Sequence, residues 1–429
     1  MTDDQTRTAL LEAVGAGFEA QVALTAELTS FASLRGEEAP AQDFMARQMQ
    51  ARGLDVDRFR IDLDRIRHLP GFSPVHVNYD NAWNVVGTRR ATAPTGKSLI
   101  LNGHIDVVPE GPLEMWTSPP YAPRRDGDWL YGRGVGDMKA GLVACLAALD
   151  AIDRAGFAPA ADICVQSVVE EECTGNGALA CLERGYRADA VLIPEPLHEC
   201  LIRAQIGVIW FRVRVQGVPV HVADAGEGAN AIMAAYQVIQ ALKGLEADWN
   251  ARKADDPDYA DVPHPINLNV GKIAGGDWAS SVPSWCEFDV RVAIFPGQQI
   301  ADAKAEIEDR ISRAARDIPF LRNNPPQVSY NGFEAEGYRL EQAEAPVAAL
   351  SAAHEAVFGG KLDTVASTAT TDARFFGLYG KMPALVYGPK AERIHGFDER
   401  VDLVSLRKVT QSMVLFIAQW CGLHPRDDG

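Results

Sequence analysis

Histidine and carboxylate side chains recur in this sequence directly after short apolar runs. His104 and Asp106 follow SLILN, and Glu171 and Glu172 follow DICVQSVV. The remaining candidates are Asp137 after the glycine-rich GRGVG, Glu195 after DAVLIP, and His395 in the loop after ALVYGP. Imidazole nitrogens and carboxylate oxygens are ligands that zinc and similar divalent ions accept without any thiolate. The pattern therefore predicts a metal site.

The candidate ligands are numerous enough to hold two ions. One ion would take His104 and Glu195, the other would take Glu172 and His395, and Asp137 would bridge them. Each ion would then have three protein ligands and an open position for water, which is the arrangement of catalytic sites. We therefore expect a dinuclear catalytic centre.

Two further carboxylates have expected roles beside the ligands. Asp106 lies two residues after His104, so it could accept the N–H of the second ring nitrogen and fix the tautomer. Glu171 is next to a ligand without needing to be one, which makes it the candidate general base. Together these residues predict a hydrolase that activates water.

Each motif taken alone has an ordinary explanation. An isolated His-x-Asp is usually incidental, and a Glu triplet usually forms a solvated loop. Asp137 could merely cap the helix that follows it, a common role for aspartate. His395 could be a structural loop histidine, and Glu195, between two prolines, could shape a turn. Their joint occurrence after separate apolar runs favours the metal site.

Strands and helices that would position these residues alternate along the chain. Near-continuous apolar strands between helices indicate an α/β domain with a mostly parallel sheet covered by helices on both faces. Ligands gather beyond the carboxyl ends of such strands, so distant segments would meet at one crevice. We expect two helices within 8–52, strands at 98–102, 162–169, 189–193 and 384–387, and helices at 140–152 and 177–184.

The middle of the chain has a different pattern. Strands fit 207–215, 266–273, 285–293 and 327–330, and helices fit 229–245 and 300–316. This β-α-β-β-α-β order is ferredoxin-like. We therefore expect a catalytic domain made of residues 1–206 and 334–429, with an α+β lid inserted at 207–333. The strand at 207–215 is expected at an edge of the lid sheet, where a second copy could pair with it.

Composition and charge exclude several classes of partner. The chain has 41 Lys and Arg against 58 Asp and Glu, a net charge of -17, which argues against binding nucleic acid or anionic membranes. No apolar run approaches the ~18 residues of a membrane span. The seven cysteines lie at no CxxC spacing, and the acidic start MTDDQTRTALLEAV is unlike a signal peptide. We expect reduced thiols and a cytoplasmic location.

Several strings of the sequence resemble one enzyme family. LILNGHIDVVP, YGRGVGDMKAG, VVEEECTGNG, PEP and IHGFDERV are similar to the dinuclear zinc family of acetylornithine deacetylase and succinyl-diaminopimelate desuccinylase. That family also holds aminoacylases, carboxypeptidases and dipeptidases, and the resemblance covers nearly the whole chain. It implies a zinc-peptidase-like catalytic domain and a dimerising lid. It also implies ligands His104, Asp137, Glu172, Glu195 and His395, with Glu171 as base and Asp106 behind His104.

The resemblance extends to residues outside the expected metal centre. GVPVHVADAGEGANAI resembles the segment whose histidine reaches a partner's active site, which implies His221 as an oxyanion donor in a homodimer. DVR implies Arg291 as a substrate-binding residue, and STATTDARFF implies that Thr370 and Asp372 line the pocket. By itself, the sequence around His221 would suggest only a histidine at a strand end. Ala391 stands where the desuccinylases have Asn, which weighs against a succinylated substrate.

The expected function is hydrolysis of the amide bond of a small N-acyl compound, an N-acetyl amino acid, with two zinc ions or, alternatively, cobalt or manganese. The segment 61–86 resembles a subgroup that is also similar to formylaminopyrimidine deformylases, so an N-formyl substrate stays open, as do dipeptidase and carboxypeptidase activities. A dinucleotide-dependent oxidoreductase is a rival class, but GRGVGD has GxGxG spacing and not GxGxxG. A non-catalytic small-molecule binding module is another, and nothing in the sequence favours it.

Overall fold

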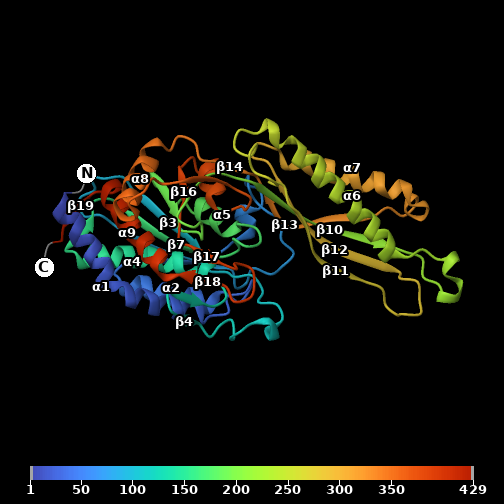
Figure 1. Cartoon of the computed structure of the whole chain (residues 1–429), viewed down its shortest axis with the longest axis horizontal. Coiled ribbons are helices and arrows are strands. Elements are labelled where there is room, and N and C mark those ends of the chain that lie inside the picture. Colours follow the sequence, from blue (N-terminus) through green and yellow to red (C-terminus); the bar gives the residue numbers. More distant parts are fainter. Residues whose placement is uncertain (1–2, 427–429) are drawn as a thin grey trace.

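Two sheets, each with its own helices and apolar core, organise the chain (Figure 1). The computed structural model describes residues 3–426, so the outermost residues of the expected ranges 1–206 and 334–429 lie outside the described part. One core is built from residues up to Ile202 and from Tyr338 onward, and the other from residues between Ala204 and Ala335. The α/β fold class with an inserted α+β unit is confirmed.

The larger sheet has the strand order β1-β2-β7-β3-β8-β16. Strands β7, β3, β8 and β16 run parallel, whereas β2 is antiparallel to both β7 and β1. Every residue of β3 and β8 is buried, as expected for strands covered on both faces. The strands are β1 (Asp55–Arg60), β2 (Trp83–Arg89), β3 (Leu99–His104), β7 (Ile163–Val168), β8 (Ala190–Ile193) and β16 (Ala384–Val386).

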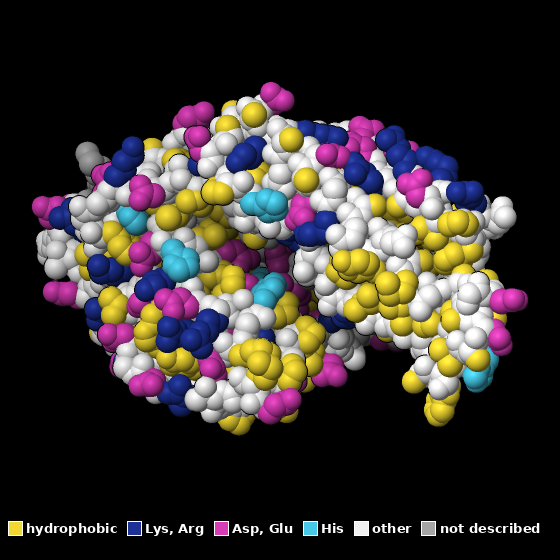
Figure 2. Space-filling view, turned by 45° about the vertical axis from the view of Figure 1, so that its right-hand side comes forward, with side chains coloured by type: hydrophobic (Ala, Val, Ile, Leu, Met, Phe, Trp, Pro, Cys, Tyr) yellow, Lys and Arg dark blue, Asp and Glu magenta, His cyan; other side chains and the backbone are white. Residues whose placement is uncertain are grey.

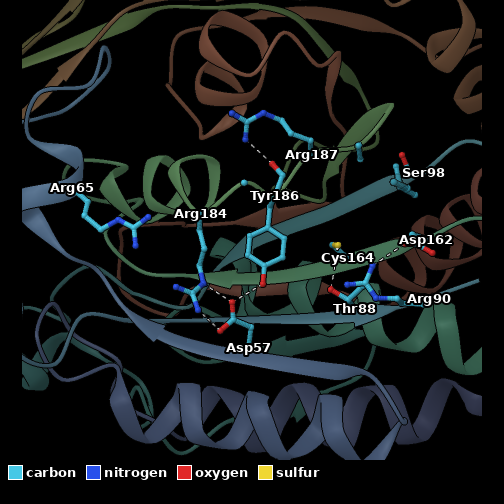
Figure 3. Close-up of a pocket in the computed structure, with 13 residues that line it drawn as sticks. Asp57, Arg65, Thr88, Arg90, Ser98, Asp162, Cys164, Arg184, Tyr186 and Arg187 are labelled. Atoms are coloured by element: carbon cyan, nitrogen blue, oxygen red, sulfur yellow. Dashed lines mark hydrogen bonds and ion pairs between the residues drawn. The ribbon is translucent and has the colours of Figure 1, made fainter.

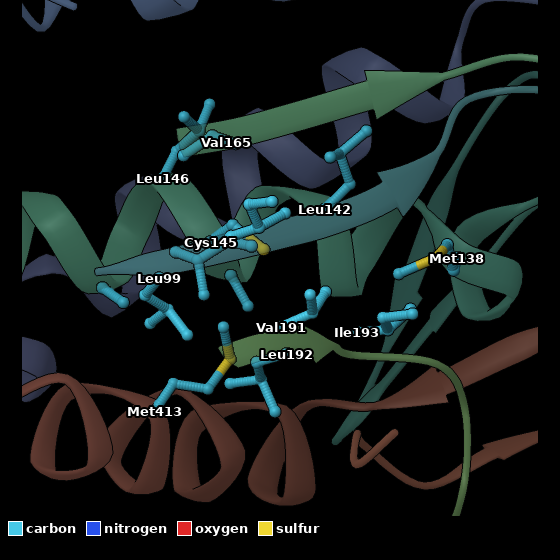
Figure 4. Packing of buried hydrophobic residues seen from close by; sticks show 14 of the residues in the cluster. Leu99, Met138, Leu142, Cys145, Leu146, Val165, Val191, Leu192, Ile193 and Met413 are labelled. Atoms are coloured by element: carbon cyan, nitrogen blue, oxygen red, sulfur yellow. The ribbon is translucent and has the colours of Figure 1, made fainter. Parts of the chain in front are cut away.

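Helices pack their apolar faces on this sheet. Figure 4 shows Leu142 and Cys145 of α4 against β3, and Met413 of α9 beside Leu192 of β8. Within residues 3–426, no helix is both long enough and apolar enough to cross a membrane. The helices of this part are α1 (Asp4–Thr29), α2 (Ala39–Ala51), α3 (Leu63–Ile66), α4 (Ala140–Arg154), α5 (Asn176–Glu183), α8 (Glu344–Phe358) and α9 (Leu403–Trp420).

The inserted unit, here called the lid, has the sheet order β11-β12-β10-β13 with all neighbours antiparallel. This is the ferredoxin-like order expected from the sequence. The expectation that the first lid strand lies at an edge is wrong, because β10 pairs with β12 on one side and β13 on the other. The elements are β10 (Gly207–Gln216), α6 (Ala231–Ala251), β11 (Leu268–Gly275), β12 (Trp285–Ile294), α7 (Ile300–Asp317) and β13 (Gln327–Ala335).

Three smaller sheets join segments that are far apart in the sequence. The one that matters for the site has the order β17-β18-β5-β4, in which β18 is antiparallel to β5. Its strands are β4 (Arg124–Asp126), β5 (Trp129–Tyr131), β17 (Ala391–Glu392) and β18 (Arg400–Asp402). The others join β14 (Tyr338–Arg339), β9 (Leu201–Gln205) and β15 (Thr364–Ser367), and β19 (Leu423–Pro425) with β6 (Phe157–Pro159).

Candidate metal centre and active site

Three neighbouring parallel strands deliver the first group of candidate residues. His104 is the last residue of β3, Glu171 and Glu172 follow β7, and Glu195 follows β8. Because β7, β3 and β8 are adjacent and parallel, their carboxyl ends lie at one edge of the sheet. This is the edge at which ligands bind in open α/β sheets.

The other two candidate ligands come from the small sheet. Asp137 follows β5 through a turn in which Gly134 has a φ of 77°, a left-handed conformation that favours glycine. His395 lies between β17 and β18, and β18 pairs with β5. The sequence pattern suggested that each candidate ligand follows a strand of the parallel sheet. Asp137 does not, because β5 belongs to the small sheet. Pairing of β18 with β5 is what brings the two residues to the crevice.

The five candidate ligands converge around the Asp137 carboxylate. Its Oδ1 lies 3.3 Å from Nε2 of His104, and its Oδ2 lies 3.3 Å from Nε2 of His395. Both carboxylate oxygens of Glu172 lie 3.2 Å from Nε2 of His395. Oε2 of Glu195 lies 3.9 Å from Nε2 of His104. The arrangement forms two groups, one around each histidine, with Asp137 shared.

The electrostatics of the cluster fit bound cations. Burial raises the pKa of Glu171 and of Glu195 well above the ordinary value. The negative charge of Glu172 raises the pKa of His395 to about 11. In the described part of the chain, no lysine or arginine is paired with Glu171, Glu172 or Glu195. Carboxylates crowded in this way repel unless cations lie among them, so the donor set suits divalent ions.

A thiolate has no part in this donor set. Cys173 follows the glutamates directly, but burial raises the pKa of its thiol well above the ordinary value, so it keeps its proton at neutral pH. The donors available to a metal ion are therefore the nitrogen and oxygen atoms expected from the sequence. One ligand atom from each of His104, Asp137 and Glu172 lies within 4.8 Å of the other two.

Asp106 contacts His104 through a different atom from the one expected. Nδ1 of His104 hydrogen-bonds to the backbone carbonyl oxygen of Asp106 at 2.9 Å, whereas the Asp106 carboxylate Oδ1 lies 3.6 Å away. The other carboxylate oxygen accepts the backbone N–H of Glu172 at 3.1 Å. Asp106 thus orients the histidine with its main chain and the glutamate loop with its side chain.

Glu170 is a residue whose contribution was missed from the sequence. It has a φ of 72°, and its carboxylate accepts two hydrogen bonds from Arg35 at 2.5 and 2.7 Å and one from Tyr79 at 2.5 Å. Thr174 donates a further hydrogen bond at 2.8 Å. These contacts hold the loop that carries Glu171. Nothing in the triplet EEE distinguishes its first member from the other two.

The three expected substrate-binding residues occupy different environments. Arg291, on β12, points its guanidinium toward the Thr368 carbonyl oxygen at 3.4 Å and has no carboxylate partner within residues 3–426. Thr370 is half-buried and bonds to Gln205 at 3.3 Å. Asp372 is 1% exposed, as is the candidate ligand His104. Burial raises the pKa of Asp372 to about 7.

His221 is the one expected site residue that is separate from the others in its own chain. It is exposed and lies in the loop after β10, where its Nδ1 accepts the backbone N–H of Ala223 at 3.1 Å. Strand β10 begins beside the catalytic domain and runs for 10 residues, which corresponds to ~30 Å. The loop after β10, which carries His221, therefore lies at the distal end of the lid (Figure 1).

The surface is hollowed between the two parts of the molecule, and acidic side chains lie deep in this hollow (Figure 2). A different cavity of about 700 Å³ lies at the opposite ends of the strands, next to Ser98 and Asp162. Figure 3 shows Arg184 bonded to Asp57 and Arg90 bonded to Asp162, whereas Arg187 bonds to the backbone carbonyl oxygen of Tyr186. Among its described lining residues there is no histidine, so its donors do not match a metal centre.

Comparisons with known proteins agree with this geometry. The N-formyl-4-amino-5-aminomethyl-2-methylpyrimidine deformylase of Halalkalibacterium halodurans is 31% identical over 81% of this chain and 84% of its own length. The succinyl-diaminopimelate desuccinylase of Stenotrophomonas maltophilia is 29% identical over 88% of this chain and 93% of its own length. The crystal structure of human carnosine dipeptidase 1 has a TM-score of 0.78 at 14% identity, covering 97% of this chain and 98% of that one.

A family model matches a much longer part of the chain than any single motif covers. Residues 100–419 match the model of Peptidase family M20/M25/M40, a span that includes all five candidate ligands and the lid. The resemblance stated from the sequence motifs is confirmed. The chain therefore belongs to Peptidase family M20/M25/M40 and is a metal-dependent hydrolase that acts on amide C–N bonds.

Proposed function

We propose that this protein removes the acyl group of a small N-acyl compound, an N-acetyl amino acid, with two divalent ions bound at the crevice. The observation that carries the proposal is the shared position of Asp137 between His104 and His395, with Glu172 and Glu195 on the two sides. Zinc suits these nitrogen and oxygen donors, and cobalt and manganese are alternatives.

Ions held by these five residues would lower the pKa of water and polarise the amide carbonyl. The chain's own residues supply the proton transfers. Glu171 is buried beside the ligands, with Oε2 3.9 Å from Nε2 of His104, and burial raises the pKa of its carboxyl above the ordinary value. A carboxylate placed beside the reacting groups can take and return a proton. Glu171 would take a proton from the attacking water and give it to the departing nitrogen.

Arg291 supports a substrate that carries a carboxylate. Its guanidinium faces the segment that contains Thr368 and Thr370 and lacks an acidic partner within the described chain. Arginine binds carboxylates through paired hydrogen bonds. The half-buried guanidinium of Arg291 donates only long hydrogen bonds of 3.4 Å, to the carbonyl oxygens of Asn267 and Thr368. Burial lowers the pKa of Arg291 to about 10, so the side chain stays charged at neutral pH.

An N-formyl amide is the second candidate substrate, because a relative that is 31% identical over 81% of the chain is a deformylase of a formylaminopyrimidine. That substrate has no carboxylate for Arg291 to bind. One experiment can therefore test both which acyl group the substrate carries and whether Arg291 binds a substrate carboxylate.

We further propose that two copies pair through their lids and that His221 of each completes the active site of the other as an oxyanion donor. Ile232, Met233 and Tyr236 of α6 expose apolar side chains, and β11 is an edge strand with Ile273 exposed. Exposed apolar side chains gather on the lid in Figure 2. Unpaired strand edges and contiguous apolar patches are typical of surfaces that pair.

A hydrolysis screen tests the substrate. Zinc-loaded protein is assayed with N-acetyl, N-formyl and N-succinyl amino acids and with the formylaminopyrimidine, in parallel with Arg291→Gln. If the substrate carries a carboxylate, the variant should raise KM by about 10–100-fold, because a charge-assisted hydrogen bond contributes ~1.5–3 kcal/mol. Arg214→Gln, on the neighbouring strand β10, is the matched control and should leave KM unchanged. An unaltered KM in Arg291→Gln, with the formylaminopyrimidine preferred, would favour the second candidate.

A further inference from the structure

Glu399 is a buried glutamate that lies immediately before β18 and accepts four hydrogen bonds from the turn that carries Asp137. Its Oε1 accepts the backbone N–H groups of Gly136 at 2.9 Å and Asp137 at 3.0 Å. Its Oε2 accepts the backbone N–H of Gly134 at 2.9 Å and an Nη1–H of Arg133 at 2.6 Å. The side chain is 1% exposed, so these contacts are protected from water.

The turn 133–137 presents its N–H groups to one point because Gly134 is left-handed. Backbone N–H groups that converge in this way form a concave anion-binding site, which is here filled by a carboxylate of the chain itself. A carboxylate that accepts four hydrogen bonds offsets the cost of its own burial. The turn would otherwise have several buried N–H groups without partners.

Arg133 extends the same contact to the loop of His395. Its Nη1 bonds to Glu399, and its Nη2 bonds to the carbonyl oxygen of Gly396 at 3.0 Å. Gly396 is the residue after His395, and Glu399 is four residues after it. The Arg133–Glu399 pair therefore joins the loop of Asp137 to the loop of His395.

We propose that Glu399 is a positioning residue that holds Asp137 between the two histidines and thereby sets the metal affinity of the centre. Asp137 must place one oxygen 3.3 Å from His104 and the other 3.3 Å from His395, so a small rotation of its turn moves it away from one of them. The proposal rests on the proposed ligand set, because Glu399 acts on the metal only through Asp137 and His395.

Glutamine cannot replace Glu399 in this position. Each carboxylate oxygen accepts from two donors, so either orientation of a glutamine amide would turn its NH₂ group toward two N–H groups. Glu399→Gln keeps the size of the side chain but loses about half of the hydrogen bonds and opposes donor to donor. The substitution therefore tests the hydrogen bonding and not the packing.

The experiment titrates Zn²⁺ into metal-free protein in competition with a chelator and measures the Tm of each protein with and without Zn²⁺. We expect Glu399→Gln to bind Zn²⁺ about 10–100-fold more weakly than the wild type, the range seen when residues behind metal ligands are changed. The rise in Tm caused by Zn²⁺ should shrink as well. Glu246→Gln is the matched control, since Glu246 is a buried glutamate of the lid that accepts a backbone N–H from Leu268 at 2.8 Å.

A merely structural role would lower the Tm of the metal-free variant but leave the Zn²⁺ affinity and the Zn²⁺-induced rise in Tm as in the wild type, and that result would overturn the proposal. The control should lower Tm without changing either metal readout. If Glu399→Gln does not fold, Arg133→Lys is measured in its place. Lysine keeps the charge but cannot bond to both Glu399 and Gly396, so the Zn²⁺ affinity and the Zn²⁺-induced rise in Tm of this variant test the proposal. A wild type that binds fewer than two ions would contradict the dinuclear centre, whereas the affinity ratio between variant and wild type still tests Glu399.

Discussion

Three consecutive glutamates have three different environments in this protein. Glu170 is bonded to Arg35, Glu171 lies near His104, and Glu172 lies 3.2 Å from His395. The side chains diverge because Glu170 has a positive φ, which turns the backbone at the end of β7. One anchors the loop, one can move protons and one can bind a cation. Residue type alone therefore says little here, and environment assigns the role.

The first prediction concerns Glu171 as the general base. Glu171→Gln cannot accept a proton, but it leaves the five candidate ligands unchanged, so two ions per chain should remain. General acid–base catalysis contributes ~10²–10⁴-fold, and Glu171 would act twice in one turnover, so kcat should fall by at least that factor. Steady-state kinetics and elemental analysis of the same preparation measure both effects. Near-normal turnover would show that another group moves the proton.

A second prediction separates the bridging ligand from a terminal one. Asp137 contacts both histidines, so Asp137→Ala should lose binding of both ions, whereas His104→Ala should mainly lose one. Elemental analysis after dialysis against a fixed free Zn²⁺ concentration gives the number of ions per chain. At most one ion in the active wild type would contradict the dinuclear arrangement.

At the scale of elements, the apolar strands were predictable and the short polar ones were not. The expected strands at 98–102 and 162–169 are confirmed as β3 and β7, because buried parallel strands are nearly continuous apolar runs. Strand β1, with the sequence DVDRFR, was missed because four of its six residues are charged and its two apolar residues, Val56 and Phe59, do not follow the alternation of a strand. Strands of two or three residues, such as β17 and β5, have no periodicity to detect.

The candidate ligands were found from the sequence, whereas the residues that orient them were not. A histidine or an aspartate after an apolar run indicates a ligand by its chemistry. Glu399 accepts hydrogen bonds from backbone N–H groups more than 260 residues earlier in the chain. Every residue except proline has a backbone N–H group, so residue types do not show which groups a distant carboxylate contacts. The edge position expected for β10 was wrong for a related reason. The alternation of apolar and polar residues along a strand shows which of its faces is buried. It does not show which strands pair with it, so it could not place β10 inside the sheet.

A third prediction concerns Glu38, which begins helix α2 but makes no capping hydrogen bond. Burial, aided by the charge of Asp106, raises its pKa from 4.5 to about 8. Its folded-state pKa is above its unfolded value, so its contribution to stability is full below pH 4.5 and is lost as the pH rises through 8. Each pKa unit corresponds to ~1.4 kcal/mol.

Glu38→Gln resembles the protonated side chain at every pH. The metal-free variant and wild type should therefore unfold at the same urea concentration near pH 4.5, and the variant should become more stable than the wild type as the pH approaches 8. Urea unfolding of both proteins at several pH values measures the difference. A difference that does not change with pH would contradict the raised pKa.

At the scale of the whole molecule, the lid separates His221 from the metal centre by the length of β10. That strand lies inside its sheet, so it cannot pair with a second copy, and β11 is the available edge on that side. The exposed Trp278 and the apolar face of α6 lie on the same unit. A lid that projects from the catalytic domain and carries a histidine at its distal end is suited to reach a neighbouring molecule (Figure 1).

The last prediction follows from this separation. If His221 acts in the partner's active site, Glu171→Gln and His221→Ala should each be inactive as pure dimers, because removing an oxyanion donor costs ~10²–10³-fold in kcat. When the two variants exchange subunits, one of the two sites in a mixed dimer contains an intact Glu171 and receives an intact His221 from its partner. Activity should therefore return in proportion to the mixed dimers, whose amount is measured by native mass spectrometry. If mixed dimers form and no activity returns, His221 does not complete a neighbouring site, and the lid must serve another purpose.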